Sequence, residues 1–344
     1  MDIQTAIANV ASGESLTVDA MKSVMLAVMQ GEATEAQIGG LLVGLRMKGE
    51  TIDEVVGAAT AMRSLATPVS IDRSGLIDMC GTGGDGTNLF NVSTAATFVV
   101  AAAGGRIAKH GNRSVSSSSG SSDVLAALGV NLEVTPEQIA QCIEEVGVGF
   151  MFAPAHHSAM KHAIGPRREL AMRTIFNILG PLTNPAGAKR QVLGVFDKSL
   201  CEPLASALHE LGSEHVLVVH GNDGLDELSV ASTSHVCEMK AGELTSYEVD
   251  PTDFGLRVGS LSGLCVDNSE QSAALIRSAL GGENSENADA ARAIIAMNAG
   301  AGLYVGGRAD SLQAGVVLAA ATIESGKALH CLNAFADKTQ ELAG

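Results

Sequence analysis

The chain has 344 residues, of which 46% are hydrophobic, so it is long enough for two domains and buries a sizeable core. Its formal net charge of −16 argues against a generic nucleic-acid or anionic-membrane surface, because both need positive potential. The six cysteines form no CxxC pair and no zinc-like cluster, and the first residues lack a signal-peptide pattern, so we expect a cytoplasmic protein with reduced thiols.

Residues 1–68 are predicted to form an N-terminal helical domain. Apolar residues recur there at helical spacing, and Thr51 with Glu54 has the pattern of a capping box at the start of the last helix. Pro68 and the short strand-like stretch after it end this domain.

From about residue 76, short apolar strands alternate with helices, which predicts an α/β domain over residues 69–344. The expected strands are 76–79, 106–108, 191–196 and 215–220, followed by a hairpin of 235–239 and 244–249. The expected helices are 93–103, 122–128, 136–146, 168–180 and 199–211, and most of the chain from about residue 270.

A glycine-rich loop follows the first expected strand and has the form of a dinucleotide-binding fingerprint, Gly81-x-Gly83-x-x-Gly86. That function requires an acidic residue about 20 positions further on to hold the ribose. Residues 87–122 contain no Asp or Glu, but they contain Arg106, Lys109 and Arg113. The loop is therefore predicted to bind an anion larger than one phosphate rather than NAD.

A second loop follows the second expected strand and supports the same interpretation. The first loop leads to Asn91 and Ser93, either of which can cap a helix whose free N–H groups suit a phosphate. The second loop, 109–121, is rich in cations and serines and also leads to a helix. Two such loops predict a ligand with two phosphate groups, and the alternative is a pair of ordinary strand–helix turns.

An adjacent Asp226 and Glu227 follow the strand expected at 215–220. A pyrophosphate commonly carries Mg²⁺, which prefers carboxylate oxygens and water. These two residues are the candidate magnesium ligands, although an Asp-Glu pair in a loop can also be a solvated turn.

Four segments occur in a diagnostic order: GTGGDGTNLFNVST, KHGNRSVSSSSGSSDVL, GPRRELAMRTIFNILGPLTNP and HGNDGLDELS. With them, essentially the whole chain resembles the anthranilate phosphoribosyltransferase family. The resemblance implies a small all-helical domain, 1–68, with a helical segment at about 168–186 packing on it. It also implies a larger α/β domain, 69–344, with a central mixed, mostly parallel sheet flanked by helices, and a homodimer formed through the helical domain.

The resemblance also implies an Mg²⁺-dependent transfer of the phosphoribosyl group from phosphoribosyl pyrophosphate to anthranilate, with two Mg²⁺ per subunit and no nucleic-acid or membrane partner. Lys109 and Arg167 would contribute positioning and electrostatics, and no general base is expected. Ser93, Asp226 and Glu227 match the magnesium ligands, and the residues matching the anthranilate site are Gly81, His110, Asn112, Arg167 and Pro181. The residues matching the phosphoribosyl pyrophosphate site are Gly81, Gly84, Asp85, Leu89, Asn91, Val92, Ser93, Thr94, Lys109, His110, Gly111, Asn112, Arg113, Ser114, Val115, Ser116, Ser117 and Ser121.

Two positions depart from the family pattern, namely Leu89, where many members have Thr or Ser, and Ser118, where many have Lys. We expect these changes to alter diphosphate affinity without abolishing activity. His156 and His157 are expected to pack and hydrogen-bond near the domain junction rather than to catalyse. The alternatives are a nucleoside phosphorylase-like enzyme and a non-catalytic nucleic-acid-binding paralogue. The Asp-Glu pair and the acidic composition favour the transferase.

Overall fold

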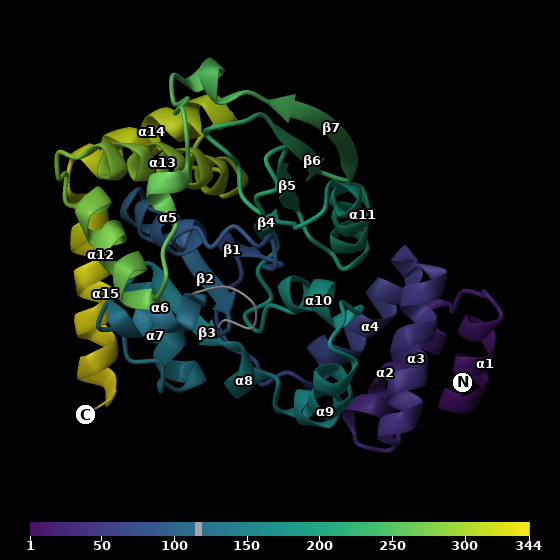
Figure 1. Ribbon diagram of the computed structural model, residues 1–344. Coiled ribbons are helices and arrows are strands. Elements are labelled where there is room, and N and C mark those ends of the chain that lie inside the picture. Colours follow the sequence, from purple (N-terminus) through teal and green to yellow (C-terminus); the bar gives the residue numbers. More distant parts are fainter. Residues whose placement is uncertain (114–118, 344) are drawn as a thin grey trace.

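The computed structural model describes residues 1–113 and 119–343, and Figure 1 shows how the elements are arranged. Asp2, Thr17, Thr34 and Thr51 each accept a backbone N–H of the helix that they precede. The expected capping box of Thr51 and Glu54 is present. These caps begin the four N-terminal helices: α1 (Ile3–Ala11), α2 (Val18–Met29), α3 (Glu35–Lys48) and α4 (Ile52–Leu65).

Glu54 is fully buried inside this bundle and is fully hydrogen-bonded. Its Oε1 accepts the N–H of Leu16 at 2.9 Å, and its Oε2 accepts the N–H of Thr51 at 2.8 Å and Nζ of Lys48 at 2.9 Å. A buried charge is tolerated when it is paired in this way. Glu54 therefore ties together the α1–α2 loop, the end of α3 and the start of α4.

The larger part of the chain contains one seven-stranded sheet in the order β3-β2-β1-β4-β5-β6-β7. The first five strands in this order run parallel, β6 runs antiparallel to β5, and β7 runs antiparallel to β6, so the sheet is mixed and mostly parallel as expected. The chain leaves β1 for β2 on one side and returns to β4 on the other, and ligands collect at the carboxyl ends of strands beside such a reversal. The strands are β1 (Leu76–Gly81), β2 (Arg106–Gly111), β3 (Val148–Phe152), β4 (Arg190–Gly194), β5 (His215–Gly221), β6 (Ser234–Lys240) and β7 (Glu243–Val249).

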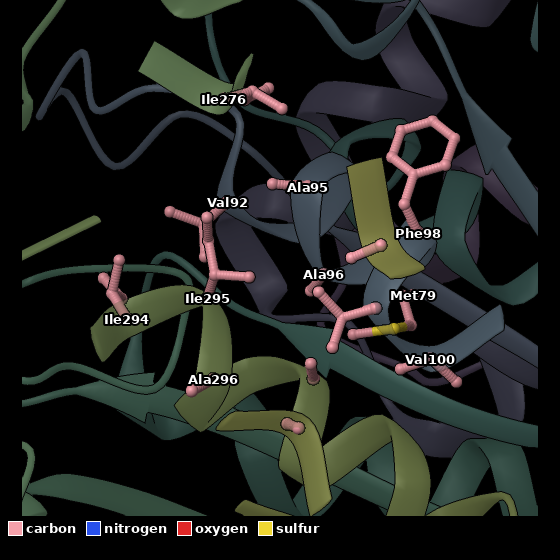
Figure 2. Packing of buried hydrophobic residues seen from close by; sticks show 14 of the residues in the cluster. Met79, Val92, Ala95, Ala96, Phe98, Val100, Ile276, Ile294, Ile295 and Ala296 are labelled. Carbon is pink, nitrogen blue, oxygen red and sulfur yellow. The ribbon is translucent and has the colours of Figure 1, made fainter. Parts of the chain in front are cut away.

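A helical layer covers one face of the sheet. Figure 2 shows its core, where Met79 of β1 lies near Val100 of α5. Gly300 allows helices α13 and α14 to approach closely, because a Cβ at this position would lie only 2.6 Å from the nitrogen of Val316. The layer contains α5 (Val92–Ala102), α6 (Ser121–Ala127), α12 (Ser269–Leu280), α13 (Glu286–Val305), α14 (Leu312–Glu324) and α15 (Lys327–Ala343), and α7 (Pro136–Val146) packs on β3 and α15.

The helical bundle adjoins the sheet through α11 (Cys201–Glu210), which contacts both α4 and strands β5, β6 and β7. Buried side chains form one cluster that runs from Met62 of α4 through Leu204 of α11 to Val216 of β5. The bundle and the sheet therefore share a hydrophobic core. Figure 1 shows the bundle on the opposite side of the molecule from α12 and α15.

Two features differ from the sequence-based expectations. Strand β3 was not expected, because VGFMF is a short apolar run without the polar–apolar alternation of a half-exposed strand. The helix expected over 168–180 is wrong as one element: α9 (Lys161–Leu170) ends where Ala171 adopts φ +46°, and α10 (Phe176–Leu179) begins after a turn. Helix α9 packs on α2 and α3, and α10 packs on α4.

The short helix α8 (Ala153–His156) follows β3. Among residues 1–113 and 119–343, no helix has the length and apolar character needed to span a bilayer.

Candidate active site

A cleft of about 500 Å³ lies at the carboxyl ends of β1, β2, β4 and β5, where the sheet changes direction. All site residues predicted from the sequence that fall within the described part of the chain line this cleft. Ser114, Val115, Ser116, Ser117 and the divergent position Ser118 lie outside the described residues. The structure thus brings together segments that are more than 140 residues apart in sequence, while their individual roles stay predictions.

The glycine loop follows β1 and contacts the acidic pair directly. Gly83, Gly84 and Gly86 have φ values of +64°, +77° and +76°, which other residues rarely adopt. The N–H of Gly83 donates to Oδ2 of Asp226 at 2.8 Å. A Cβ on Gly81 would lie 2.5 Å from the same oxygen, so Gly81 permits Asp226 to approach the loop.

The backbone of Asp226 is fixed by β4. A Cβ on Gly194 would lie 1.5 Å from the carbonyl oxygen of Asp226, so this position requires glycine. Sequence reasoning did not single out Gly194, because the contact joins residues that are distant in the chain. The sheet thereby sets the distance between the acidic pair and the glycine loop.

Glu227 caps helix α5. Its Oε1 accepts the N–H of Ser93 at 3.0 Å. Asn91, one of the two caps that the sequence offered, occupies the N-cap position but makes no side-chain capping bond. Its amide nitrogen donates to the carbonyl oxygen of Ser119 at 3.1 Å, and its Oδ1 accepts from Oγ of Ser272 at 2.8 Å. Asn91 therefore fastens the start of α5 to its neighbours.

Lys109 is buried at the floor of the cleft. Its Nζ donates to the carbonyl oxygen of Met79 and to Oγ of Ser93, the latter at 3.2 Å. Burial lowers the pKa of Lys109, and nearby groups that can carry negative charge, Cys80 and Asp78 ahead of Glu227 and Asp226, oppose that shift. Lys109 therefore supplies positive charge between the glycine loop and α5.

The acidic pair is suited to a divalent cation. Burial raises the pKa of both Asp226 and Glu227, and the charge of a neighbouring carboxylate raises each pKa further. A bound cation would remove this penalty. Within the described residues no group of three or more His, Cys, Asp and Glu side chains could hold a metal. Mg²⁺ commonly uses only one or two carboxylates with water and substrate phosphates, so the pair fits it.

His110 forms part of the cleft wall, and its main chain is held by a buried carboxylate. Oδ1 of Asp78 accepts the backbone N–H of His110 at 3.1 Å. Oδ2 of the same carboxylate accepts a hydrogen bond from Nδ2 of Asn184 at 2.8 Å. The ring of His110 lies 5.2 Å from that of His157. Burial lowers the pKa of His110 to about 3 and that of His157 to about 4, so both rings are neutral at pH 7.

His156 and His157 contact the junction between the bundle and the sheet. Nδ1 of His156 lies 2.8 Å from the carbonyl oxygen of Thr67, in the linker after α4. Nε2 of His157 lies 3.5 Å from Oγ1 of Thr183. Both side chains are buried, and neither lines the cleft, which accords with the expected packing role.

Arg167 enters the cleft from α9, on the side of the helical bundle. Its guanidinium lies 5.1 Å from the centre of the Phe176 ring, and Phe176 and Pro181 line the same wall. This wall combines one cation with flat apolar surfaces. It can bind a planar aromatic carboxylate, with Arg167 on the carboxylate and the ring among apolar groups.

Three further predicted residues, Val92, Leu89 and Asp85, line the cleft, and each also makes contacts within the protein. Val92 is 2% exposed and packs into the core, so only its backbone faces the cleft. Leu89 pairs with Cys265 in an isolated bridge and packs against the core. Asp85 accepts the hydroxyl of Thr87 at 2.6 Å, which braces the glycine loop internally.

Arg173 is a cleft residue that the sequence analysis did not select. Its Nη2 donates to the carbonyl oxygen of Gly84 at 2.5 Å, and its guanidinium lies 3.8 Å from the centre of the Phe196 ring. It joins the α9–α10 turn to the glycine loop. The only sequence signal was an arginine inside the quoted segment RTIFN, which does not indicate a partner.

Comparisons with known proteins agree with this geometry. Family models described as the helical bundle domain and the a/b domain of a glycosyl transferase family match residues 4–66 and 73–329. An anthranilate phosphoribosyltransferase of Teredinibacter turnerae is 60% identical over 342 residues, covering 99% of this chain and 98% of that protein.

Solved structures are similar over nearly the full length. The anthranilate phosphoribosyltransferase of Thermus thermophilus has a TM-score of 0.90 and 43% identity, covering 97% of this chain and 99% of that one. The Saccharomyces cerevisiae enzyme in complex with PRPP and Mg has a TM-score of 0.88 and 27% identity, covering 98% of both chains. The same yeast enzyme in complex with 4-fluoroanthranilate has a TM-score of 0.87 and 26% identity, again covering 98% of both.

Proposed function

The chain belongs to the anthranilate phosphoribosyltransferase family, and from this we infer that its cleft holds the two substrates on opposite walls. The chain transfers the 5-phosphoribosyl group from phosphoribosyl pyrophosphate (PRPP) to the amine of anthranilate, giving N-(5-phosphoribosyl)anthranilate and pyrophosphate for tryptophan biosynthesis. The observation that carries the assignment is the buried pair Asp226 and Glu227 facing Lys109 and the start of α5.

PRPP is proposed to bind along the glycine loop and the start of α5. The N–H groups of the loop and the Lys109 ammonium provide donors and positive charge for the diphosphate. The segment after β2, from Lys109 to Ser117 with Ser121, is proposed to surround the rest of the molecule. Leu89, which offers no hydroxyl, leaves diphosphate binding to the backbone, the cations and magnesium.

Ser93, Asp226 and Glu227 would hold Mg²⁺, and we propose two ions per subunit. When bound, Mg²⁺ would neutralise the diphosphate and favour its departure. The two carboxylates would hold it on side chains whose positions β4 and α5 already fix. That fixed geometry spares the site from reorganising during the reaction.

Anthranilate is proposed to bind on the wall formed by Arg167, Pro181 and His110, with Gly81 and Asn112 at its edges. Arg167 would hold the carboxylate, which orients the amine toward the anomeric carbon. The neutral His110 ring would present a flat surface without a charge, in keeping with its lowered pKa.

The reaction breaks the bond between the anomeric carbon and the pyrophosphate oxygen and forms a bond from that carbon to the amine nitrogen. Negative charge grows on the departing pyrophosphate, where Lys109 and the α5 N-terminus would stabilise it. An aromatic amine is neutral at pH 7, and it can release its proton to solvent or to pyrophosphate after attack. No general base is therefore required, and catalysis would depend on Lys109 and Arg167 for charge and position.

The organisation of the molecule extends the proposal. We propose domain limits at 1–68 and 69–344, with the segment of about 168–186 packing on the first. We also propose a homodimer formed through the helical domain. Five of the seven large apolar side chains exposed within the described residues belong to the bundle or to the 161–172 segment beside it: Met1, Met47, Ile52, Ile164 and Met172. All six cysteines are free thiols, which supports a cytoplasmic location.

The decisive experiment is a turnover assay with anthranilate, PRPP and Mg²⁺ that follows the loss of anthranilate fluorescence. We expect turnover that stops when EDTA removes the metal. A well-folded protein that shows no turnover and binds nucleic acid instead would overturn the proposal, and replacement of PRPP by a nucleoside with phosphate tests the phosphorylase alternative.

A further inference from the structure

A second cavity, of about 210 Å³, lies at the other end of the strands. It is bordered by residues that precede β1, β4 and β5, namely Arg73, Lys189 and Ser213, and by Arg63 at the end of α4. It is thus separated from the substrate cleft by the length of the sheet. It lies where the helical bundle joins the α/β part of the chain.

The cavity is positively charged in a protein whose net charge is −16. Arg63, Arg73 and Lys189 line it, and none of its described lining residues is an Asp or Glu. The three cations come from three separate segments, the bundle, the linker before β1 and the turn before β4. Such convergence of cations without interleaved acids is characteristic of an oxyanion site.

Arg63 is held in place by the backbone. Its Nε donates to the carbonyl oxygen of Leu182 at 2.7 Å and its Nη1 to that of Leu211 at 3.0 Å. Burial lowers the pKa of Arg63 to about 10, and the positive charge of Arg73 contributes to the shift. These bonds satisfy carbonyl groups near the ends of α10 and α11, and they leave the guanidinium without a carboxylate partner among the described residues.

Arg73 lies over Gly187, where a Cβ would come within 3.0 Å of its Cζ. Its guanidinium pairs with no carboxylate in the described part of the chain. The adjacent Asp72 is engaged elsewhere, because its Oδ1 accepts the hydroxyl of Ser74 at 2.8 Å and its Oδ2 lies 3.8 Å from Nη1 of Arg106. Arg73 is therefore the cation most available to a ligand.

Lys189 has a partner, but a weak one. Its Nζ lies 3.5 Å from Glu214, which is also 3.5 Å from Nε of Arg190. Both members of the Lys189–Glu214 pair are about half exposed, so their attraction is small and screened by salt. An anion in the cavity can compete for Lys189.

We propose that this cavity binds one small oxyanion, a phosphate or carboxylate group, between Arg63, Arg73 and Lys189. The bound group would bridge the bundle, the linker and the sheet, and it would relieve the repulsion between the two arginines. This site is separate from the transfer reaction and from its substrates.

The test measures binding of inorganic phosphate to the full chain by calorimetry and by the rise of Tm with phosphate concentration. Phosphate can also enter the substrate cleft, so the comparison is between variants with an unchanged cleft. We expect Arg73→Gln to weaken the phosphate binding attributed to the cavity about tenfold, because it removes one charge-assisted contact. Lys189→Gln should weaken it in the same direction.

The matched control is Lys327→Gln, which removes an exposed cation at the start of α15, remote from the cavity. The proposal is overturned if Arg73→Gln and Lys189→Gln bind both phosphate and acetate as the wild type does, or if Lys327→Gln weakens binding equally. If Arg73→Gln does not fold, Lys189→Gln decides the outcome. Acetate is titrated in parallel to distinguish the two classes of anion. The cavity takes phosphate groups if Arg73→Gln weakens the binding of phosphate, and carboxylate groups if it weakens the binding of acetate.

Discussion

Glu227 caps the helix that carries Ser93, with its Oε1 3.0 Å from the backbone nitrogen of Ser93. The hydroxyl of the same serine accepts Nζ of Lys109 at 3.2 Å. A carboxylate, a helix N-terminus and an ammonium therefore meet at one residue. Any change at Glu227 acts on both the start of α5 and the proposed magnesium site.

Glu227→Gln keeps an oxygen that can accept the Ser93 N–H but loses the negative charge. We expect the protein to fold and its Mg²⁺ affinity to fall about 10- to 100-fold. The measurement is the Mg²⁺ dependence of turnover, with Glu243→Gln, at an exposed carboxylate on β7, as the control. An unchanged Mg²⁺ dependence would contradict the assignment of Glu227.

Arg167→Gln removes the cation proposed for the anthranilate carboxylate. We expect the KM for anthranilate to rise about 10- to 100-fold, because a hydrogen bond between charged groups is lost, and the KM for PRPP to stay the same. The control is Arg168→Gln, which changes the neighbouring residue on the same helix. Equal effects on both substrates would show that Arg167 does not select anthranilate.

Arg173→Gln and Arg173→Lys test the contact between the α9–α10 turn and the glycine loop. Both should raise the KM for PRPP about tenfold. Gln loses the cation, and Lys lacks the planar group that stacks on Phe196 while it reaches the Gly84 carbonyl. The KM for anthranilate should not change. A selective effect on anthranilate would place Arg173 on the other wall of the cleft.

Glu54→Ala leaves Lys48 and two backbone N–H groups without their acceptor inside the bundle. We expect the free energy of unfolding to fall by about 3–5 kcal/mol, as for other broken buried ion pairs. Urea denaturation provides the measurement. Glu54→Gln, which retains an acceptor, should lose less, and equal losses in the two variants would contradict the account.

His157 links stability to pH. Its pKa is lowered to about 4 in the folded protein, so between pH 6.5 and 4 the unfolded state binds a proton that the folded state does not. This difference in proton uptake has no effect on stability above pH 6.5, and it lowers the free energy of unfolding as the pH falls from 6.5 toward 4, with a slope of up to about 1.4 kcal/mol per pH unit. His157→Gln should reduce the pH dependence of urea unfolding in this range, where His110 contributes in the same direction, and an unchanged slope would show that His157 does not titrate as described.

The general architecture could be predicted because local patterns determine it. The capping box at Thr51, the short apolar strands and the glycine loop each have a signature within a few residues. The gathering of the glycine loop, Lys109 and the acidic pair at one edge followed from a rule for parallel strands, whose carboxyl ends share that edge.

The remaining features could not be predicted because partners distant in the chain decide them. Asn91 has the chemistry of a cap, yet Glu227 takes that role and Asn91 bonds Ser119 and Ser272. The helix expected at 168–180 is interrupted at Ala171, and the turn it creates lets Arg173 reach Gly84. Gly194 acquires its importance only when Asp226 packs on it.

The apolar cluster that joins α4, α11 and β5 has a consequence for how the chain unfolds. The helices of the bundle cannot melt without exposing the apolar side chains of α11, and α11 in turn covers β5 and β6. Thermal denaturation should therefore follow a single cooperative transition despite the two family modules. A fragment containing the bundle alone would expose the residues that α11 covers, and it should associate or aggregate rather than fold as a soluble unit.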